Sequence, residues 1–331
     1  FESVRIRYDL AERRQFSIEG AGGYIPQNDG YFMWFLDLKG RNIFGRGQKA
    51  GLLADRRERN KSVFNVYYGQ PTFLLGRGET LVRIGTRDYR DRFYEFGAAL
   101  RHEMELNESI SLRSRLGWKN VEPADTAARS FQVYDVSVGI RGGSVEAYKG
   151  APVGFSLDWQ ISYSGRRYGR KENVANIARA VYNDTRNELN ARFGVPIQSF
   201  ISGYAGLEVK DIQSSEKPLP VSEMFFIGGV GSLRGYRNDQ FSGQRVMLST
   251  YELRFFVSHR DYLYPFVNGA YFERYESGID GGVSKLDDFK WGYGFGLRLS
   301  SAQRQLGIEF SWGEGANLEE PRLHITLGSQ F

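Results

Sequence analysis

Apolar and polar residues alternate along nearly the whole chain. In residues 151–164, Phe155, Leu157 and Trp159 fall on one face, and Asp158 and Gln160 fall on the other. A period of two residues places successive side chains on opposite faces of a β-strand. The alternation therefore predicts a β-protein in which each strand has one apolar face and one polar face.

About sixteen segments with this alternation follow one another, and no helical period interrupts them. An even number of antiparallel strands returns both chain ends to the same side of the sheet. The expected strands cover residues 15–24, 30–39, 47–57, 61–69, 79–88, 91–104, 107–120, 128–143, 151–164, 178–194, 200–211, 245–258, 262–275, 288–300, 304–314 and 321–331.

Strand length and composition favour a membrane barrel over a soluble sandwich, which also alternates. Many segments exceed the ~9–11 residues that a strand needs to cross a bilayer, and no apolar run approaches the ~18 residues of a membrane helix. Aromatic residues make up 15% of the chain, yet the mean hydropathy is only -0.46. A membrane barrel combines a high aromatic content with a low mean hydropathy, because it has an apolar outer band, aromatic girdles and a polar lumen. The expected fold is a 16-stranded antiparallel transmembrane β-barrel.

Charge and cysteine content exclude several classes of protein. The net charge of +5 is spread over scattered, paired residues, so we expect no nucleic-acid partner. The chain has no cysteine, which excludes disulfides and cysteine metal sites. It starts at Phe1 without a signal peptide, as expected of a mature or trimmed form.

The first expected strand, "FSIEGAGGY", is weak because Gly20, Gly22 and Gly23 have no side chains to pack. A barrel in lipid must close between its first and last strands, since an open edge leaves amides unsatisfied. These glycines indicate either a bend at a barrel corner or a seam that opens.

The segment from about 212 to 244, around Leu233-Arg234-Gly235-Tyr236, interrupts the alternation. A loop this long usually has a function of its own. We expect it to fold into the lumen, where Arg234 needs an acidic partner. The lumen-facing candidates are Glu252 and Glu309, and space would come from Gly292, Gly294 and Gly296.

Four motifs resemble the outer membrane protein 85 superfamily, the family of BamA- and TamA-type barrels. "GGVGSLRGY" is similar to its lumen-loop motif, and "LKGRNIFGRGQKAGL" to its link between the second and third strands. "YPFVNGAYFE" resembles its thirteenth strand, and "HITLGSQF" its closing strand.

The resemblance implies a sixteen-stranded barrel with its sixth outer loop in the lumen, a labile seam and upstream POTRA domains. Arg234 would be the loop-tip arginine, completed by Gly235 and Tyr236, while Gly328 and Phe331 would lie at the seam and in the sorting signal. Residues 1–14 would be the tail of a POTRA-like domain or a linker, and residues 15–331 the barrel.

One position departs from the family pattern. The family usually has an aspartate where this chain has Asn268, before Gly269. Asparagine accepts a hydrogen bond from arginine without neutralising it. We therefore expect Glu252 or Glu309 to carry the ion pair.

Other candidate sites have simpler interpretations. His102, His259 and His324 are scattered, which favours interfacial or lumen residues over a catalytic or metal site. "GRGQKAG" and "GGVGSLRG" do not match nucleotide-binding loops. The run from Arg166 to Lys171 is expected in an outer loop, either solvated or in contact with lipopolysaccharide phosphates. No cofactor, metal or enzymatic activity is expected.

The expected function is insertion or translocation of proteins at the bacterial outer membrane. Partners would be unfolded client proteins, the lipid bilayer with its lipopolysaccharide, and POTRA domains. Two alternatives remain open: dedicated secretion of a partner or fused passenger, and a passive pore.

Overall fold

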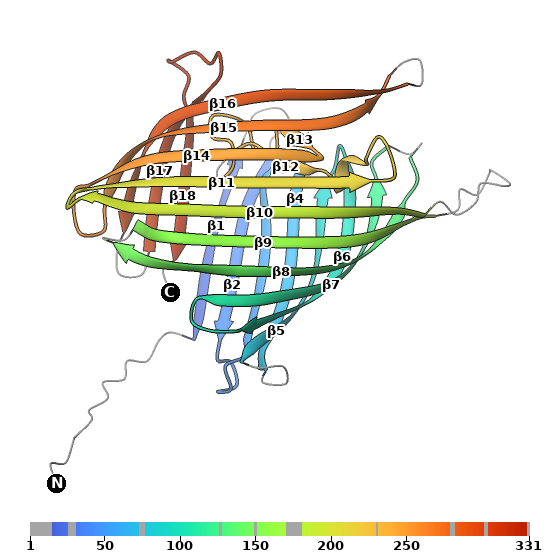
Figure 1. Cartoon of the computed structure of the whole chain (residues 1–331), viewed down its shortest axis with the longest axis horizontal. Helices are drawn as coiled ribbons and strands as arrows, with labels where there is room; N and C mark the ends of the chain where they lie inside the picture. Colours follow the sequence, from blue (N-terminus) through green and yellow to red (C-terminus); the bar gives the residue numbers. More distant parts are fainter. Residues whose placement is uncertain are drawn as a thin grey trace, which may run out of the picture.

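The computed structural model describes residues 15–25, 31–72, 77–125, 128–148, 151–169, 181–229, 231–278, 282–300 and 304–329. Figure 1 shows that these residues form one strongly curved sheet whose long strands run side by side. Within this part of the chain, no helix has the length and apolar character needed to cross a bilayer.

The sheet contains sixteen antiparallel strands in chain order, and a separate two-stranded hairpin, β12 and β13, lies between β11 and β14. Their bounds are β1 Phe16–Ile25, β2 Tyr31–Arg41, β3 Lys49–Glu58, β4 Lys61–Thr72, β5 Gly78–Tyr89, β6 Phe93–Glu105, β7 Ile110–Pro123, β8 Phe131–Tyr148, β9 Ala151–Tyr168, β10 Val181–Gln198, β11 Ile201–Ser214, β12 Phe225–Ile227, β13 Phe241–Gly243, β14 Arg245–Phe256, β15 Tyr262–Ser277, β16 Val283–Ser300, β17 Arg304–Gly313 and β18 Arg322–Ser329.

All sixteen predicted strands are confirmed, with ends that differ by a few residues. The segment between β11 and β14, predicted to lack regular structure, contains the 3₁₀ turn η1 (Val221–Glu223) and the β12–β13 hairpin. The hairpin forms because Phe225 pairs with Gly243 and Ile227 pairs with Phe241, which closes the base of the long connection.

The alternation separates an outer apolar face from an inner polar face. In β9, Phe155 is 48% exposed on the outside, whereas Ser162 on the inner face is 7% exposed. Large exposed apolar side chains recur on most strands of the sheet. An outward apolar band around a polar interior is the arrangement of a transmembrane barrel, so the predicted fold class is confirmed.

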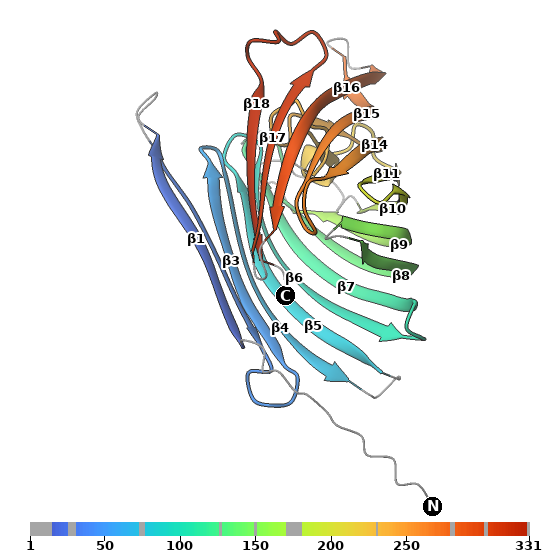
Figure 2. The same ribbon diagram turned by 90° about the vertical axis from the view of Figure 1, so that its left-hand side faces the viewer.

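The two edge strands of the sheet are β1 and β18. Figure 2 shows them facing each other and converging toward the end of the barrel where β1 begins and β18 ends. β1 pairs with β2 at every position from Phe16 to Ile25, and the pairing passes through Gly20, Gly22 and Gly23 without a bulge. Among the described residues no register joins β1 to β18; Gly328 pairs with Gln305 of β17, and Phe331 lies outside the described residues.

The buried core lies inside the barrel, between the wall and the long connection. One apolar cluster joins Leu233 and Tyr236 of that connection to Val246, Ala270 and Phe272 of the wall. A second cluster on β5 to β8 contacts Phe226 of the same connection. The connection therefore packs against two separate stretches of the inner wall.

Candidate functional site: the loop in the lumen

Residues 215–244 form the connection between β11 and β14, called here the lumen loop, and all but residue 230 are described. The loop turns back into the barrel, so that its tip is buried: Leu233 is 0% exposed and Arg234 5%. Leu233 packs among Ile227, Val246 and Leu248 in the apolar cluster of the wall. This burial removes apolar surface from water and holds the tip inside.

Arg234 contacts three wall strands at once. Its Nε donates to Oδ1 of Asn268 on β15 at 2.7 Å, and its Nη1 donates to Oε1 of Glu252 on β14 at 3.0 Å. Oε1 of Glu309 on β17 lies 3.7 Å from the same Nη1. The guanidinium carbon also lies 3.5 Å from the ring centre of Phe266, a cation–π contact.

The partners of Arg234 are themselves fixed by further bonds. Asn268 Nδ2 donates to Thr250 Oγ1 at 2.6 Å. Glu252 accepts two bonds from Arg254, and Glu309 accepts one from the hydroxyl of Tyr264 at 2.6 Å. Arg234 and Arg254 thus face Glu252 and Glu309 in a nearly dry site, where such bonds are stronger than in water. Arg298 Nη2 also lies 4.0 Å from Oε1 of Glu309.

Gly235 and Tyr236 extend the contact toward β16, β17 and β18. Gly235 has φ +93°, a conformation that L side chains rarely adopt, and its carbonyl accepts a bond from Arg322 Nε at 3.1 Å. The hydroxyl of Tyr236 donates to the carbonyl of Trp291 and accepts from the amide of Glu314, both at 2.9 Å. The four residues of the tip therefore contact every strand from β14 to β18 between them.

The three glycines of β16 have different neighbours. A Cβ at Gly292 would lie 2.0 Å from the carbonyl oxygen of Arg234, so the loop tip occupies the space that this glycine leaves. Gly294 and Gly296 instead make room for the rings of Phe266 and Tyr264. The structure brings Gly292 to the loop tip and leaves the other two beneath the aromatic wall of β15.

A second contact region of the lumen loop was missed by the sequence analysis. Glu223 of η1 is fully buried, 2.8 Å from Lys119 Nζ on β7 and 2.6 Å from Arg186 Nη2 on β10. Burial would raise the pKa of its carboxyl, but Lys119 and Arg186 outweigh burial and lower the pKa to about 2. Glu223 therefore remains ionised and tied to the wall.

Two further acids of the loop bind wall cations. Glu216 accepts a bond from Tyr168 and lies 2.9 Å from Arg166 Nη1, and Asp239 contacts Lys61 and Tyr89. The sequence offered one indication of these contacts: the loop is rich in acidic residues, and the strands carry arginines and lysines at inward positions. Alternation alone could not pair them, because the path of the loop is set by tertiary packing.

The run from Arg166 to Lys171 was expected in an outer loop, and this expectation was wrong for Arg166, Arg167 and Tyr168, which belong to β9. β9 continues to Tyr168, and Arg166 is fully buried with Nη2 2.8 Å from Oδ1 of Asp184 on β10. The strand extends because Arg166 points inward to these acids. Arg170 and Lys171 lie outside the described residues.

The histidines lie apart from one another. His102 on β6 contacts Thr80 Oγ1, His259 is in the β14–β15 turn, and His324 on β18 pairs in register with Glu309. In the described part of the chain, no three metal-ligating side chains come together.

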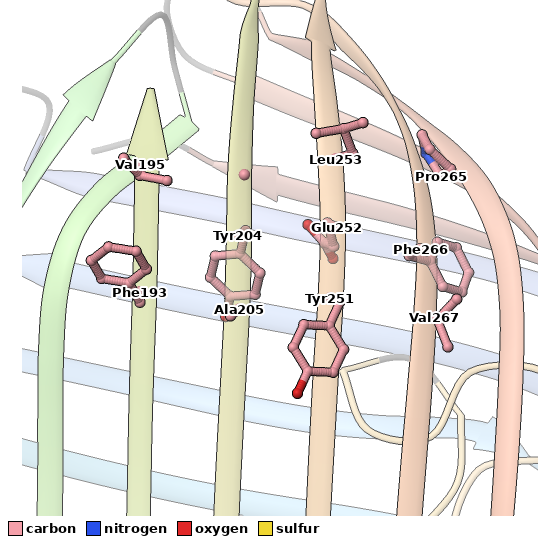
Figure 3. A pocket seen from close by; sticks show the side chains of 11 residues that line it. Phe193, Val195, Tyr204, Ala205, Tyr251, Glu252, Leu253, Pro265, Phe266 and Val267 are labelled. Carbon is pink, nitrogen blue, oxygen red and sulfur yellow. The ribbon is translucent and has the colours of Figure 1, made fainter. Parts of the chain in front are cut away.

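An apolar groove of about 460 Å³ lies on the outer face of β10, β11, β14 and β15 (Figure 3). The groove forms because Gly203 has no side chain and Ala205 has only a methyl group, while their neighbours on β10 and β14 are larger. Gly203 pairs with Val195 and Leu253, and Ala205 with Phe193 and Tyr251. Glu252 and Phe266, which contact Arg234, also line the groove, so a single layer of strands separates the two sites.

The chain combines sixteen membrane-barrel strands with a buried loop that has Arg234 at its tip, and these features are typical of one class of outer-membrane barrels. The sequence matches the Omp85 superfamily domain over residues 42–331, and the chain belongs to this superfamily. Its members are outer-membrane barrels that assemble or translocate proteins. No curated protein sequence matches the chain significantly.

Solved structures of similar fold include BamA from Haemophilus ducreyi lacking POTRA domains 1–3, with 15% identity and a TM-score of 0.64 over 96% of this chain and 71% of that one. CdiB from Acinetobacter baumannii gives 14% identity and a TM-score of 0.59 over 95% and 59% of the two chains. CdiB from Escherichia coli gives 14% identity and a TM-score of 0.53 over 96% of this chain and 62% of that one. The chain thus spans less than two thirds of either CdiB.

Proposed function

We propose that this barrel inserts client proteins into the bacterial outer membrane at the seam between β1 and β18. The observation that carries the proposal is the lumen loop, whose tip ties β14, β15, β16, β17 and β18 together through Arg234, Gly235 and Tyr236. The loop stiffens the wall on one side of the seam. The other side ends in β1, whose glycines contribute little side-chain packing.

A client strand would pair with the edge of β1 in place of β18. Strand addition supplies main-chain hydrogen bonds to the client, and these bonds are worth most where lipid offers no alternative partner. Folding of the client drives the step, so no nucleotide is needed. Upstream POTRA domains would deliver the client, and residues 1–14 would lead from them into β1.

Stapling the seam tests this function. The chain has no cysteine, so pairs of introduced cysteines along β1 and β18 can be oxidised without background. We expect the oxidised staple to abolish client insertion into proteoliposomes, and reduction to restore it. Phe310 and Leu323 face each other across β17 and β18, so F310C/L323C staples neighbouring strands without closing the seam. Full insertion by seam-stapled protein would refute the proposal.

Dedicated secretion of one partner through the lumen is a second candidate. It is favoured by a polar cavity of about 390 Å³ between the lumen loop and the inner wall of β4 to β10. Secretion through the lumen would continue with the seam stapled and stop when the loop is cross-linked to the wall. The two staples therefore separate the two functions.

A passive pore is the third candidate, and the buried loop tip counts against it. A pore that conducts at rest needs an open lumen, whereas here the loop crosses the interior and contacts β4, β7 and β10 as well as the C-terminal strands. Conductance of the intact barrel equal to that of a loop-deleted barrel would favour the pore.

A further inference from the structure

Glu223 occupies a cationic site on the inner wall, away from the Arg234 contacts. Lys119, which holds Glu223, is also 3.1 Å from Glu95 of β6. Glu95 in turn accepts two bonds from Arg87 of β5. Three wall cations, Arg87, Lys119 and Arg186, thus share two carboxylates, and one of these belongs to the loop. Without Glu223, Lys119 would keep Glu95 as a partner, and Arg186 would lose this ion pair.

The cavity beside Glu223 is large enough for a bound segment. Its volume is about 390 Å³, and Glu223 forms part of its lining. The inward positions Gly85, Gly97 and Ala99 leave the space empty on the wall side. Volumes of this order are typical of ligand sites in proteins.

Basic residues lead along the wall to this site. Arg113, Arg115 and Lys119 all face inward on β7, and Arg113 and Arg115 lie between Lys119 and the β6–β7 turn. That turn is at the end of the barrel where β1 begins, because β7, like β1, is an odd-numbered strand of an antiparallel series. Arg113 contacts Asp158 on β9 and Arg115 contacts Asp135 on β8, so each cation already binds a carboxylate of the wall.

We propose that Lys119 and Arg186 form a binding site for the carboxylates of an acidic, extended client segment, and that Glu223 fills this site in the resting barrel. A client carboxylate that replaces Glu223 releases η1 from Lys119 and Arg186. This inference rests on the proposed function, since a client segment must reach the lumen.

An extended polypeptide fits this site better than a small anion. Acidic residues at every second position of a strand lie on one face about 7 Å apart, so an extended segment presents several carboxylates to the wall, one of which can replace Glu223. Exchange of one carboxylate for another keeps the buried cations paired, so the high cost of an unpaired buried charge is avoided.

The probe is a synthetic peptide of about ten residues with glutamate at every second position, and its control has glutamine at those positions. Single-channel current is recorded in planar bilayers, with peptide added at the barrel end where β1 begins. We expect Glu223→Gln to lower the half-blocking concentration of the acidic peptide roughly tenfold, because a charge-assisted hydrogen bond no longer competes. The double variant E223Q/K119Q loses this gain.

Glu188→Gln is the matched control. Glu188 lines the same cavity on β10, so this variant removes one negative charge and leaves Glu223 bound. We expect its half-blocking concentration to stay within about twofold of wild type. Equal effects of E188Q and E223Q, or equal block by the acidic and glutamine peptides, would overturn the proposal.

Cross-linking keeps the proposal testable if E223Q does not fold. A photoreactive residue in place of Gln160, which lines the cavity, should capture the acidic peptide about tenfold more than the glutamine peptide. Equal capture overturns the inference. Neither assay measures client insertion, so a failed seam staple and a failed peptide assay are separate results.

Discussion

The Nε atom of Arg234 donates a 2.7 Å hydrogen bond to Oδ1 of Asn268, an acceptor without charge. The positive charge of the guanidinium is therefore balanced elsewhere, by Glu252 at 3.0 Å and Glu309 at 3.7 Å on the two strands that flank β15 and β16. Asn268 thus helps to position the guanidinium, whereas Glu252 and Glu309 balance its charge. Substitutions at these residues can therefore test the two effects separately.

Arg234→Ala should unseat the loop tip and impair function. Breaking a buried ion pair from one side costs roughly 3–5 kcal/mol, because the remaining carboxylates keep their desolvation cost. We expect reduced client insertion and a lower unfolding temperature of the folded barrel. Arg237→Ala, an exposed residue of the same loop, is the control and should stay within about 0.5 kcal/mol of wild type. Full complementation by R234A at normal abundance would contradict the prediction.

Glu252→Gln removes the nearest carboxylate of Arg234 and should lower the stability of the barrel. The additional change Asn268→Asp places a carboxylate at the Nε bond and should recover part of this loss. The double variant should be more stable than E252Q alone, by thermal unfolding in detergent. Recovery should be partial, because Arg254 also bonds to Glu252. A double variant less stable than E252Q would show that the charge of Glu252 does not hold the tip.

Gly292→Ala should displace the loop tip without removing any polar group. A Cβ at this position would lie 2.0 Å from the carbonyl oxygen of Arg234. The backbone of β16 or of the loop tip must therefore move to relieve the clash. We expect a higher resting conductance and lower thermal stability. Gly165→Ala on β9 is the control, since its nearest atom would be 3.9 Å away. Equal behaviour of the two variants would mean that the tip has room to shift.

Tyr236→Phe should weaken the contact with β16 and the β17–β18 connection. The hydroxyl donates to the carbonyl of Trp291 and accepts from the amide of Glu314, and these two backbone groups also bond to each other at 3.1 Å. The expected loss is about 0.5–1.5 kcal/mol in stability, measured by denaturant unfolding. Tyr251→Phe, on the exposed outer face, should have little effect. Similar losses in both variants would argue against a role for these two bonds.

Acid should release η1 of the lumen loop from Lys119 and Arg186. The pKa of Glu223 is lowered to about 2 by Lys119 and Arg186, against the effect of burial. A carboxyl with a depressed folded-state pKa contributes stability above its ordinary pKa and loses it as pH falls from there through the folded value. Conductance should therefore rise as pH falls from about 4.5 toward 2, and E223Q should be open already and flat over this range. A similar pH response in E223Q would assign the acid effect to other groups.

By itself the sequence determined the sixteen strands, the side of each strand that faces lipid, and the interruption between β11 and β14. These features depend on a period of two residues and on strand length, which are local properties. The four motifs, among them the one around Arg234, were also sufficient to recognise the superfamily. The strand ends were less well determined, and β9 runs on to Tyr168 because Arg166 pairs with Asp184 across the sheet.

Only the tertiary structure decided which wall residues bind Glu216, Glu223 and Asp239 of the lumen loop. Alternation places Glu252 and Glu309 on the inner face as candidate partners of Arg234, but it does not say which wall cations a thirty-residue connection reaches. That choice depends on the path of the lumen loop, which is set by the packing of Leu233 and Phe226 on separate parts of the wall. The same packing places Glu223 between Lys119 and Arg186, a contact that joins residues far apart in the chain and has no local signal.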